Sequence, residues 1–174
     1  HYIGTAISDY GDIGIKIHAS EVARFTYGGA FLLSGDNSGD VPTGITSGPH
    51  LLWSPKKRAF RSVDADAADW VGSNLGYFSF AHGNDAMASG SSSLAMGTYT
   101  TASGDRSVAI GYNNSSTGED GVAIGTFGQT TTGFVLGQRD TTTTGFAIGY
   151  DLNAGAGYAI GKGFSSTETD AVQI

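Results

Sequence analysis

The four histidines are the first candidates for chemistry, because imidazole serves both as a metal ligand and as a general base. Their positions, His1, His18, His50 and His82, match no zinc-binding spacing, and no H-E-x-x-H sequence occurs. Ser, His and Asp are all present, but without the G-x-S-x-G sequence of a hydrolase nucleophile. The chain has no cysteine, which excludes thiolate catalysis, disulfides and Cys-type zinc sites. These residues argue against an enzyme.

Two charged clusters and one glycine-rich loop remain as candidate binding sites. Residues 64–69 carry three aspartates without EF-hand spacing, so a solvated loop is the preferred interpretation and bound Ca²⁺ the alternative. Residues 56–61 form the basic cluster, for which pairing with 64–69 across an oligomer is preferred over an acidic glycan. Residues 157–163 resemble a phosphate loop, but the spacing is one residue short and Gly163 replaces the required Ser or Thr. We therefore expect no cofactor.

The composition narrows the class of protein further. The chain has 174 residues, of which 28 are Gly, 39% are hydrophobic and 14% are charged. This balance argues against a disordered chain. A net charge of −7 gives no basic field to attract nucleic acid or an anionic membrane. No apolar run approaches the ~20 residues that a membrane helix needs, so we expect no direct membrane insertion.

A five-residue block ending in Gly recurs along the second half of the chain. Residues 107–111, with the sequence SVAIG, represent it. The closing glycines are Gly83, Gly97, Gly111, Gly125, Gly137, Gly149 and Gly161, at steps of 14, 14, 14, 12, 12 and 12 residues. Steps this short exclude helix-pair and leucine-rich repeats and predict coils of two short strands joined by tight turns, with Gly at positive φ. Residues 171–174 align with the block, so a Gly is expected to follow Ile174.

Both faces of the repeated strand are apolar. The larger set is assigned to the interior of the coil, and it includes Val108, Ile110, Val122, Ile124, Phe146, Ile148 and Ile160. The opposite face carries the small residues Ala95, Ala109, Ala123, Val135, Ala147 and Ala159. A strand that is apolar on both faces is buried on both faces. We therefore expect the small row to pack against other subunits of an oligomer.

The blocks at 88–97 and 101–111 resemble the head repeats of trimeric autotransporter adhesins, the YadA-like head. The resemblance extends over residues 79–174, and it implies a left-handed parallel β-roll in which three chains form a homotrimer. The 12-residue coils depart from the usual 14 and indicate shortened turns. Similar modules occur in phage tail fibres and other bacterial surface proteins. The resemblance is therefore stronger evidence for the fold and the trimer than for the setting, bacterial surface or virion, in which the protein occurs.

Residues 1–78 differ in composition and are expected to form an irregular, all-β N-terminal cap before the roll at 79–174. Residues 13–17 alternate Ile with Gly or Lys, as a half-buried strand does. Further strands are expected at 22–27, 30–33, 51–53 and 59–61, separated by turn clusters. A solenoid needs a cap to cover its first open edge, which this segment would supply.

The sequence as a whole favours a non-enzymatic, extracellular protein of the bacterial cell surface or of a virion tail fibre. Its expected role is that of a trimeric adhesin head binding a host protein or glycan. The exposed ligand contacts are expected at turn residues: Arg106, Tyr112, Phe127, Arg139 and Tyr150. The alternatives are a structural fibre or sheath subunit that assembles end to end, a phage tail-fibre module, and, less favoured, an ice-binding β-solenoid suggested by the threonine runs at 130–132 and 141–144.

Overall fold

The structure is a computed structural model. It describes residues 47–66, 69 and 72–163 with their side chains, and the backbone of strands at 3–7, 13–17, 20–25, 31–33 and 172–173. The chain divides into two compact units, residues 1–39 and 40–174, which are described separately. Histidines 1 and 18 lie outside the described residues.

The first unit contains a four-stranded antiparallel sheet with the order β1-β2-β3-β4. Its strands are β1 (Ile3–Ile7), β2 (Ile13–Ile17), β3 (Ser20–Phe25) and β4 (Phe31–Leu33). Three of them fall where the sequence predicts strands. The sequence therefore locates β2, β3 and β4 of this sheet.

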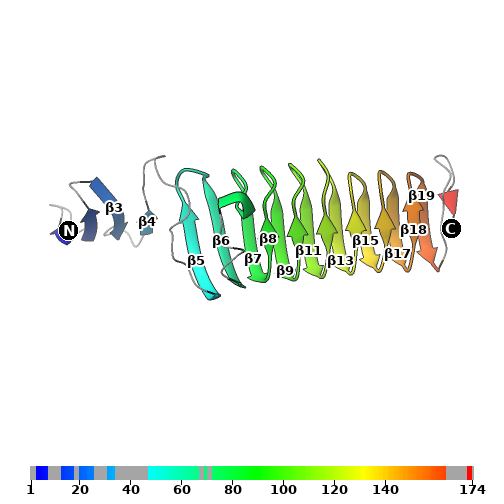
Figure 1. Cartoon of the computed structure of the whole chain (residues 1–174), viewed down its shortest axis with the longest axis horizontal. Coiled ribbons are helices and arrows are strands. Elements are labelled where there is room, and N and C mark those ends of the chain that lie inside the picture. Colours follow the sequence, from blue (N-terminus) through cyan, green and yellow to red (C-terminus); the bar gives the residue numbers. More distant parts are fainter. Residues whose placement is uncertain are drawn as a thin grey trace. The chain divides into compact units, whose positions relative to one another are not determined.

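The second unit contains a parallel β-solenoid built from two sheets (Figure 1). Each coil gives one long strand to the first sheet and one short strand to the second. The long strands are β7 (Phe80–Asn84), β9 (Leu94–Thr98), β11 (Val108–Tyr112), β13 (Val122–Thr126), β15 (Phe134–Gln138), β17 (Phe146–Tyr150) and β19 (Tyr158–Lys162), followed by β20 (Val172–Gln173). The short strands are β8 (Met87–Ala88), β10 (Thr101–Ala102), β12 (Ser115–Ser116), β14 (Gln129–Thr130), β16 (Thr141–Thr142) and β18 (Asn153–Gly155).

The register between coils is the register of the sequence repeat. Ala109 pairs with Ala95 on one side and with Ala123 on the other, and Gly111 pairs with Gly97 and Gly125. The same correspondence holds across the change from 14 to 12 residues, where Val122 pairs with Phe134. The all-β class and the parallel solenoid predicted from the glycine spacing are therefore confirmed.

A hairpin begins the long-strand sheet. Strand β5 (Gly48–Ser54) pairs antiparallel with β6 (Ala59–Ala65), and β6 pairs parallel with β7. A 3₁₀ turn, η2 (Gly72–Asn74), lies between the hairpin and the first coil. The hairpin thus belongs to the same sheet as the coils, and the sequence assigns it to the cap that leads into the roll. The division between compact units follows residue 39, and the boundary expected at 78 between cap and roll stays a prediction.

The predicted assignment of the strand faces is wrong, because the small residues fill the inside of the coil. Ala95, Ala109, Ala123, Val135, Ala147 and Ala159 are all fully buried within the single chain. The short strands add Ala88, Ala102, Ser116, Thr130, Thr142 and Ala154 to the same interior. With such small side chains contributed from both sheets, the sheets pack closely enough for turns of a few residues to join them. The larger residues Val108, Ile110, Val122, Ile124, Phe146, Ile148 and Ile160 therefore point outward.

The closing glycines form a tight corner of each coil. Their φ angles lie between +121° at Gly111 and +152° at Gly149. A Cβ atom at Gly97 would lie only 1.9 Å from the carbonyl oxygen of Gly111 in the next coil. Both the backbone conformation and the lack of space therefore require Gly. A side chain at this corner would push two coils apart.

Candidate interaction surfaces

The outward side of the long-strand sheet is a continuous apolar surface, called here the apolar face. It consists of two columns of large side chains: Leu94, Val108, Val122, Phe134, Phe146 and Tyr158, and beside them Met96, Ile110, Ile124, Leu136, Ile148 and Ile160. The exposed fraction reaches 52% at Tyr158 and 41% at Ile160, and most of the others are half-buried. A contiguous apolar surface of this kind marks an interaction site.

Aromatic and cationic side chains line the edge where the long strands end, called here the strand-end edge. The rings of Tyr99 and Tyr112 meet edge to face with centroids 6.1 Å apart, and those of Tyr112 and Phe127 do so at 5.4 Å. Further along, Arg139 and Lys162 lie over the ring of Tyr150, at 5.1 Å and 5.4 Å from its centroid. Four of the five predicted contact residues, namely Tyr112, Phe127, Arg139 and Tyr150, thus lie along this one edge.

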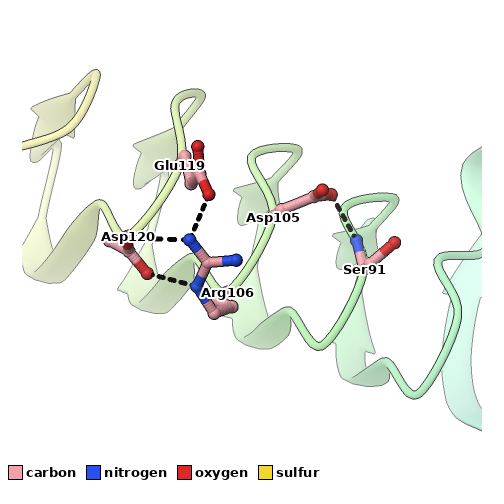
Figure 2. Close-up of polar contacts among 5 residues, drawn as sticks. All are labelled: Ser91, Asp105, Arg106, Glu119 and Asp120. Atoms are coloured by element: carbon pink, nitrogen blue, oxygen red, sulfur yellow. Dashed lines mark hydrogen bonds and ion pairs between the residues drawn. The ribbon is translucent and has the colours of Figure 1, made fainter.

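Arg106 lies instead on the opposite edge, where the turns lead into the long strands, and its guanidinium is already paired (Figure 2). Its Nε donates to Oδ1 of Asp120 at 2.6 Å, and its Nη2 donates to Oδ2 at 3.0 Å and to Glu119. This hydrogen bonding lowers the pKa of Asp120 and raises that of Arg106. One coil earlier, Asp105 accepts from the backbone N–H of Ser91 at 2.8 Å. The tips of successive 14-residue coils are therefore joined by polar contacts.

The acidic patch of residues 64–69 lies close to Asp85. Burial raises the pKa of Asp85, and the charges of Asp66, Asp69 and Asp64 raise it further. Residues 67 and 68 of the patch lie outside the described residues. Among the residues that are described, no group of three His, Asp or Glu side chains is placed to hold a metal ion.

The basic cluster of residues 56–61 makes its described contacts within the chain. Arg61 is buried, and its Nη1 donates to the carbonyl oxygen of Asp69 at 2.5 Å. Burial lowers the pKa of Arg61, and the charge of Asp69 opposes that shift. Lys57 donates from Nζ to the carbonyl oxygens of Gly72 and Leu75, at 2.5 Å and 2.7 Å. Hydrogen bonds from this cluster therefore connect the hairpin to the residues that follow it.

The threonine runs are divided between the inside and the outside of the coil. Thr130 and Thr142 are buried, and their Oγ1 atoms are 2.9 Å apart. Thr131, Thr132 and Thr143 follow them in exposed turns. The runs therefore combine an internal hydroxyl contact with solvent-facing turn residues, and only their outward members could take part in a surface.

A known family accounts for the central coils. The model of the YadA head domain repeat matches the chain twice, at residues 88–114 and 102–127. The chain carries YadA-like head repeats. No curated protein and no solved structure matches it significantly. The coils after residue 127 continue the head-repeat register with two residues fewer in each coil. No helix among the described residues is long and apolar enough to cross a membrane.

Sequence reasoning found the repeat and most of the strand-end edge, but it missed the apolar face. The signal that identifies the face is the size difference between the two sides of the strand. Ala is the rule on one side, and Val, Ile, Leu or Phe on the other. In a coil of only two strands, the smaller set belongs inside.

Proposed function

We propose that this chain is a head module of a homotrimeric, non-enzymatic adhesin of the bacterial cell surface. The observation that carries the proposal is the apolar face, which runs along the long strands from β9 to β19. A surface of this size exposed to water is unfavourable, and a second and third copy would bury it. The YadA-like head repeats support three as the number of copies. The subunits would meet through the large residues and not through the alanine row.

Attachment would then be multivalent. Three copies would present the same surfaces to a host protein or glycan, and several weak contacts made together give a much higher overall affinity. Tyr112 and Phe127 on the strand-end edge are the proposed ligand contacts in the 14-residue coils. Exposed aromatic residues of this kind are enriched at binding hot spots.

The proposal is tested by the mass of the protein in solution, measured by light scattering over a concentration series. We expect a fixed mass of three chains, and we expect Ile110→Lys combined with Ile124→Lys to yield monomers. Thr141→Lys is the matched control, since Thr141 is exposed on the short-strand sheet. A monomeric wild-type protein would overturn the proposal. A mass that grows with concentration would indicate an end-to-end fibre subunit.

A further inference from the structure

The change from 14-residue to 12-residue coils creates a step in the surface. In the longer coils, five residues join a short strand to the next long strand, as at 117–121 between β12 and β13. In the shorter coils only three residues do so, at 131–133 and 143–145. The two missing residues correspond to the projecting tip formed by Glu119 and Asp120. The tips at Asp105 and at Glu119 and Asp120, labelled in Figure 2, therefore have no counterpart in the turns at 131–133 and 143–145.

An open recess of about 300 Å³ lies beyond that last tip. The rings of Phe134, Phe146 and Tyr158 line it, with Thr132 and Thr144 beside them and Asp120 at its end. The rings of Phe134 and Phe146 stack with centroids 5.1 Å apart, and those of Phe146 and Tyr158 lie 6.2 Å apart. The first outward residue is aromatic in the three strands that follow a shortened turn, as it also is at Phe80 in β7, and it is aliphatic at Leu94, Val108 and Val122.

We propose that this recess receives the strand-end edge of a second copy of the chain, centred on Tyr150. The inference rests on the proposed trimer and adds to it the pairing of the two edges. Three copies around a three-fold axis meet head to tail, so the two lateral edges of a subunit are not equivalent. In the 12-residue coils, one edge would then contact the other edge of its neighbour. The same strands, β15, β17 and β19, carry the recess at their starts and Gln138, Tyr150 and Lys162 at their ends.

The chemistry of the two edges is complementary. The strand-end edge presents a ring beside two cations, since Arg139 and Lys162 both lie over Tyr150, and Arg139 also pairs with Oδ2 of Asp151 at 3.1 Å. The recess presents three aromatic rings, which are favourable partners for a ring and for cations, while its carboxylate, Asp120, is paired with Arg106. The recess is also part of the apolar face, because Val122, Phe134, Phe146 and Tyr158 belong to both. A subunit that covers that face would therefore close over the recess as well.

The absence of cysteine allows a direct test by disulfide cross-linking. We expect Thr132→Cys combined with Gln138→Cys to give covalent dimers and trimers under mild oxidation, on a denaturing gel without reductant. Residue 132 lies two positions before β15 and residue 138 is its last residue. At the rise per residue of a strand they are about 20 Å apart, too far for a disulfide within one chain. The control pair is Ser103→Cys with Gln138→Cys, because residue 103 is exposed and follows short strand β10. We expect this pair to remain monomeric on the gel.

A second measurement examines Tyr150 itself. Tyr150→Ala is expected to raise the concentration at which trimers dissociate by about tenfold or more, the loss typical of an interface anchor. Tyr112→Ala is the matched control, because Tyr112 ends a 14-residue coil at the equivalent position, where the opposite edge has its tips and no recess.

The outcomes separate this inference from the function on which it rests. A stable trimer whose 132–138 pair fails to cross-link would overturn the edge pairing and leave the trimer intact. If the trimer forms without these cross-links and Phe146→Ala abolishes glycan binding, the recess is a sugar-binding site instead. A monomer in light scattering would overturn both proposals.

Discussion

Asn114 and Asp140 occupy the same corner of the coil, two coils apart, but only Asn114 brings a hydrogen-bond donor there. Nδ2 of Asn114 donates to the carbonyl oxygens of Ile110 and Gly125, at 2.5 Å and 2.7 Å. Its Oδ1 accepts from the N–H of Gly128 at 2.6 Å. Oδ1 of Asp140 accepts in the same way from the N–H of Leu152 at 3.0 Å.

The second oxygen of Asp140 takes the place of the Asn114 amide nitrogen. A Cβ atom built on Gly111 would lie 3.0 Å from Nδ2 of Asn114, and one built on Gly137 would lie 2.5 Å from Oδ2 of Asp140. That Oδ2 is buried and has no hydrogen-bond partner among the described residues. A protonated carboxyl group suits this position, since it supplies the donor that Asn114 supplies two coils earlier.

Asp140 should therefore make the stability of the coil depend on pH. Burial raises the pKa of Asp140, the nearby charge of Asp151 adds to the shift, and the N–H groups of Leu152 and Gly149 oppose it. Because the folded state holds this proton more tightly than the unfolded state, the stabilising effect is fully present below the ordinary aspartate pKa of about 3.9. The effect is lost as the pH rises through the raised pKa of the folded protein.

The measurement for Asp140 is the melting temperature of the wild type and of Asp140→Asn from pH 4 to pH 8. The variant keeps the shape and supplies a donor, so we expect it to be more stable than the wild type at pH 8, by about 1–3 kcal/mol, the penalty for an unpaired buried polar group. The difference should shrink toward pH 4. A difference that is constant with pH would show that Asp140 does not titrate in this range.

Because small residues face inward and large residues face outward, substitutions of two neighbouring residues should differ in their effect on stability. Ala123→Leu places extra volume inside the coil, where Ala123 is fully buried, and should destabilise the chain by about 1–3 kcal/mol. Ile124→Ala removes outward volume from a half-buried side chain, so its effect on unfolding in dilute protein should be smaller. Urea unfolding at a concentration below trimer formation provides the comparison. If Ile124→Ala lowers the free energy of unfolding more than Ala123→Leu does, the large residues fill the interior, as the sequence predicts.

The closing glycines provide a test that separates backbone strain from crowding. Gly97 and Gly48 have nearly the same φ, +123° and +125°. A Cβ atom at Gly97 would lie 1.9 Å from the carbonyl oxygen of Gly111, whereas one at Gly48 would have no neighbour within 4 Å. Gly48→Ala should therefore cost only the strain of about 1–3 kcal/mol. Gly97→Ala should cost clearly more in thermal unfolding, and equal losses would mean that the coils separate easily at this corner.

Removal of Arg106 should change the pKa of its partner Asp120 but leave the stability of the fold almost unchanged. Arg106, Glu119 and Asp120 are all more than half exposed, and exposed ion pairs contribute little to stability. Arg106→Ala should leave the melting temperature nearly unchanged. It should also raise the pKa of Asp120 toward its ordinary value, because the hydrogen bond from Arg106 lowers it. Carboxyl titration by NMR at low salt measures this shift, and an unchanged pKa would show that the contact does not persist in solution.

The sequence predicts the coil and its register because Gly111 and its equivalents are required by backbone geometry. Periodicity alone cannot orient the strand, since both faces are apolar. The interior is restricted to small residues by the packing of one sheet against the other, which no single strand reveals. Val135 illustrates this, because its Cγ1 lies 3.0 Å from the position of a Cβ on Gly128. The larger side chain is accommodated where the neighbouring residue has none.

The strand-end edge was only partly predictable for a related reason. Positive φ angles of 55°, 56° and 57° occur at Tyr99, Phe127 and Arg139. From sequence alone, this conformation is expected mainly at Gly. They keep it because their backbone N–H groups bond to the preceding coil, as that of Phe127 does to the carbonyl oxygen of Tyr112 at 2.8 Å. The recess was not predictable from spacing, although the two missing residues were visible, because its lining comes from three successive strands.

The parallel register also determines how the roll responds to a mechanical load. The hydrogen bonds between coils point along the roll, so a pull on that axis stretches them directly. Where the whole junction is loaded at once, the five pairs between β11 and β13 and the two between β12 and β14 share the force. At a free end, where the chain is pulled away residue by residue, the same bonds break one after another. The roll should therefore resist tension that acts across its full width, and coils should separate more easily at any free end.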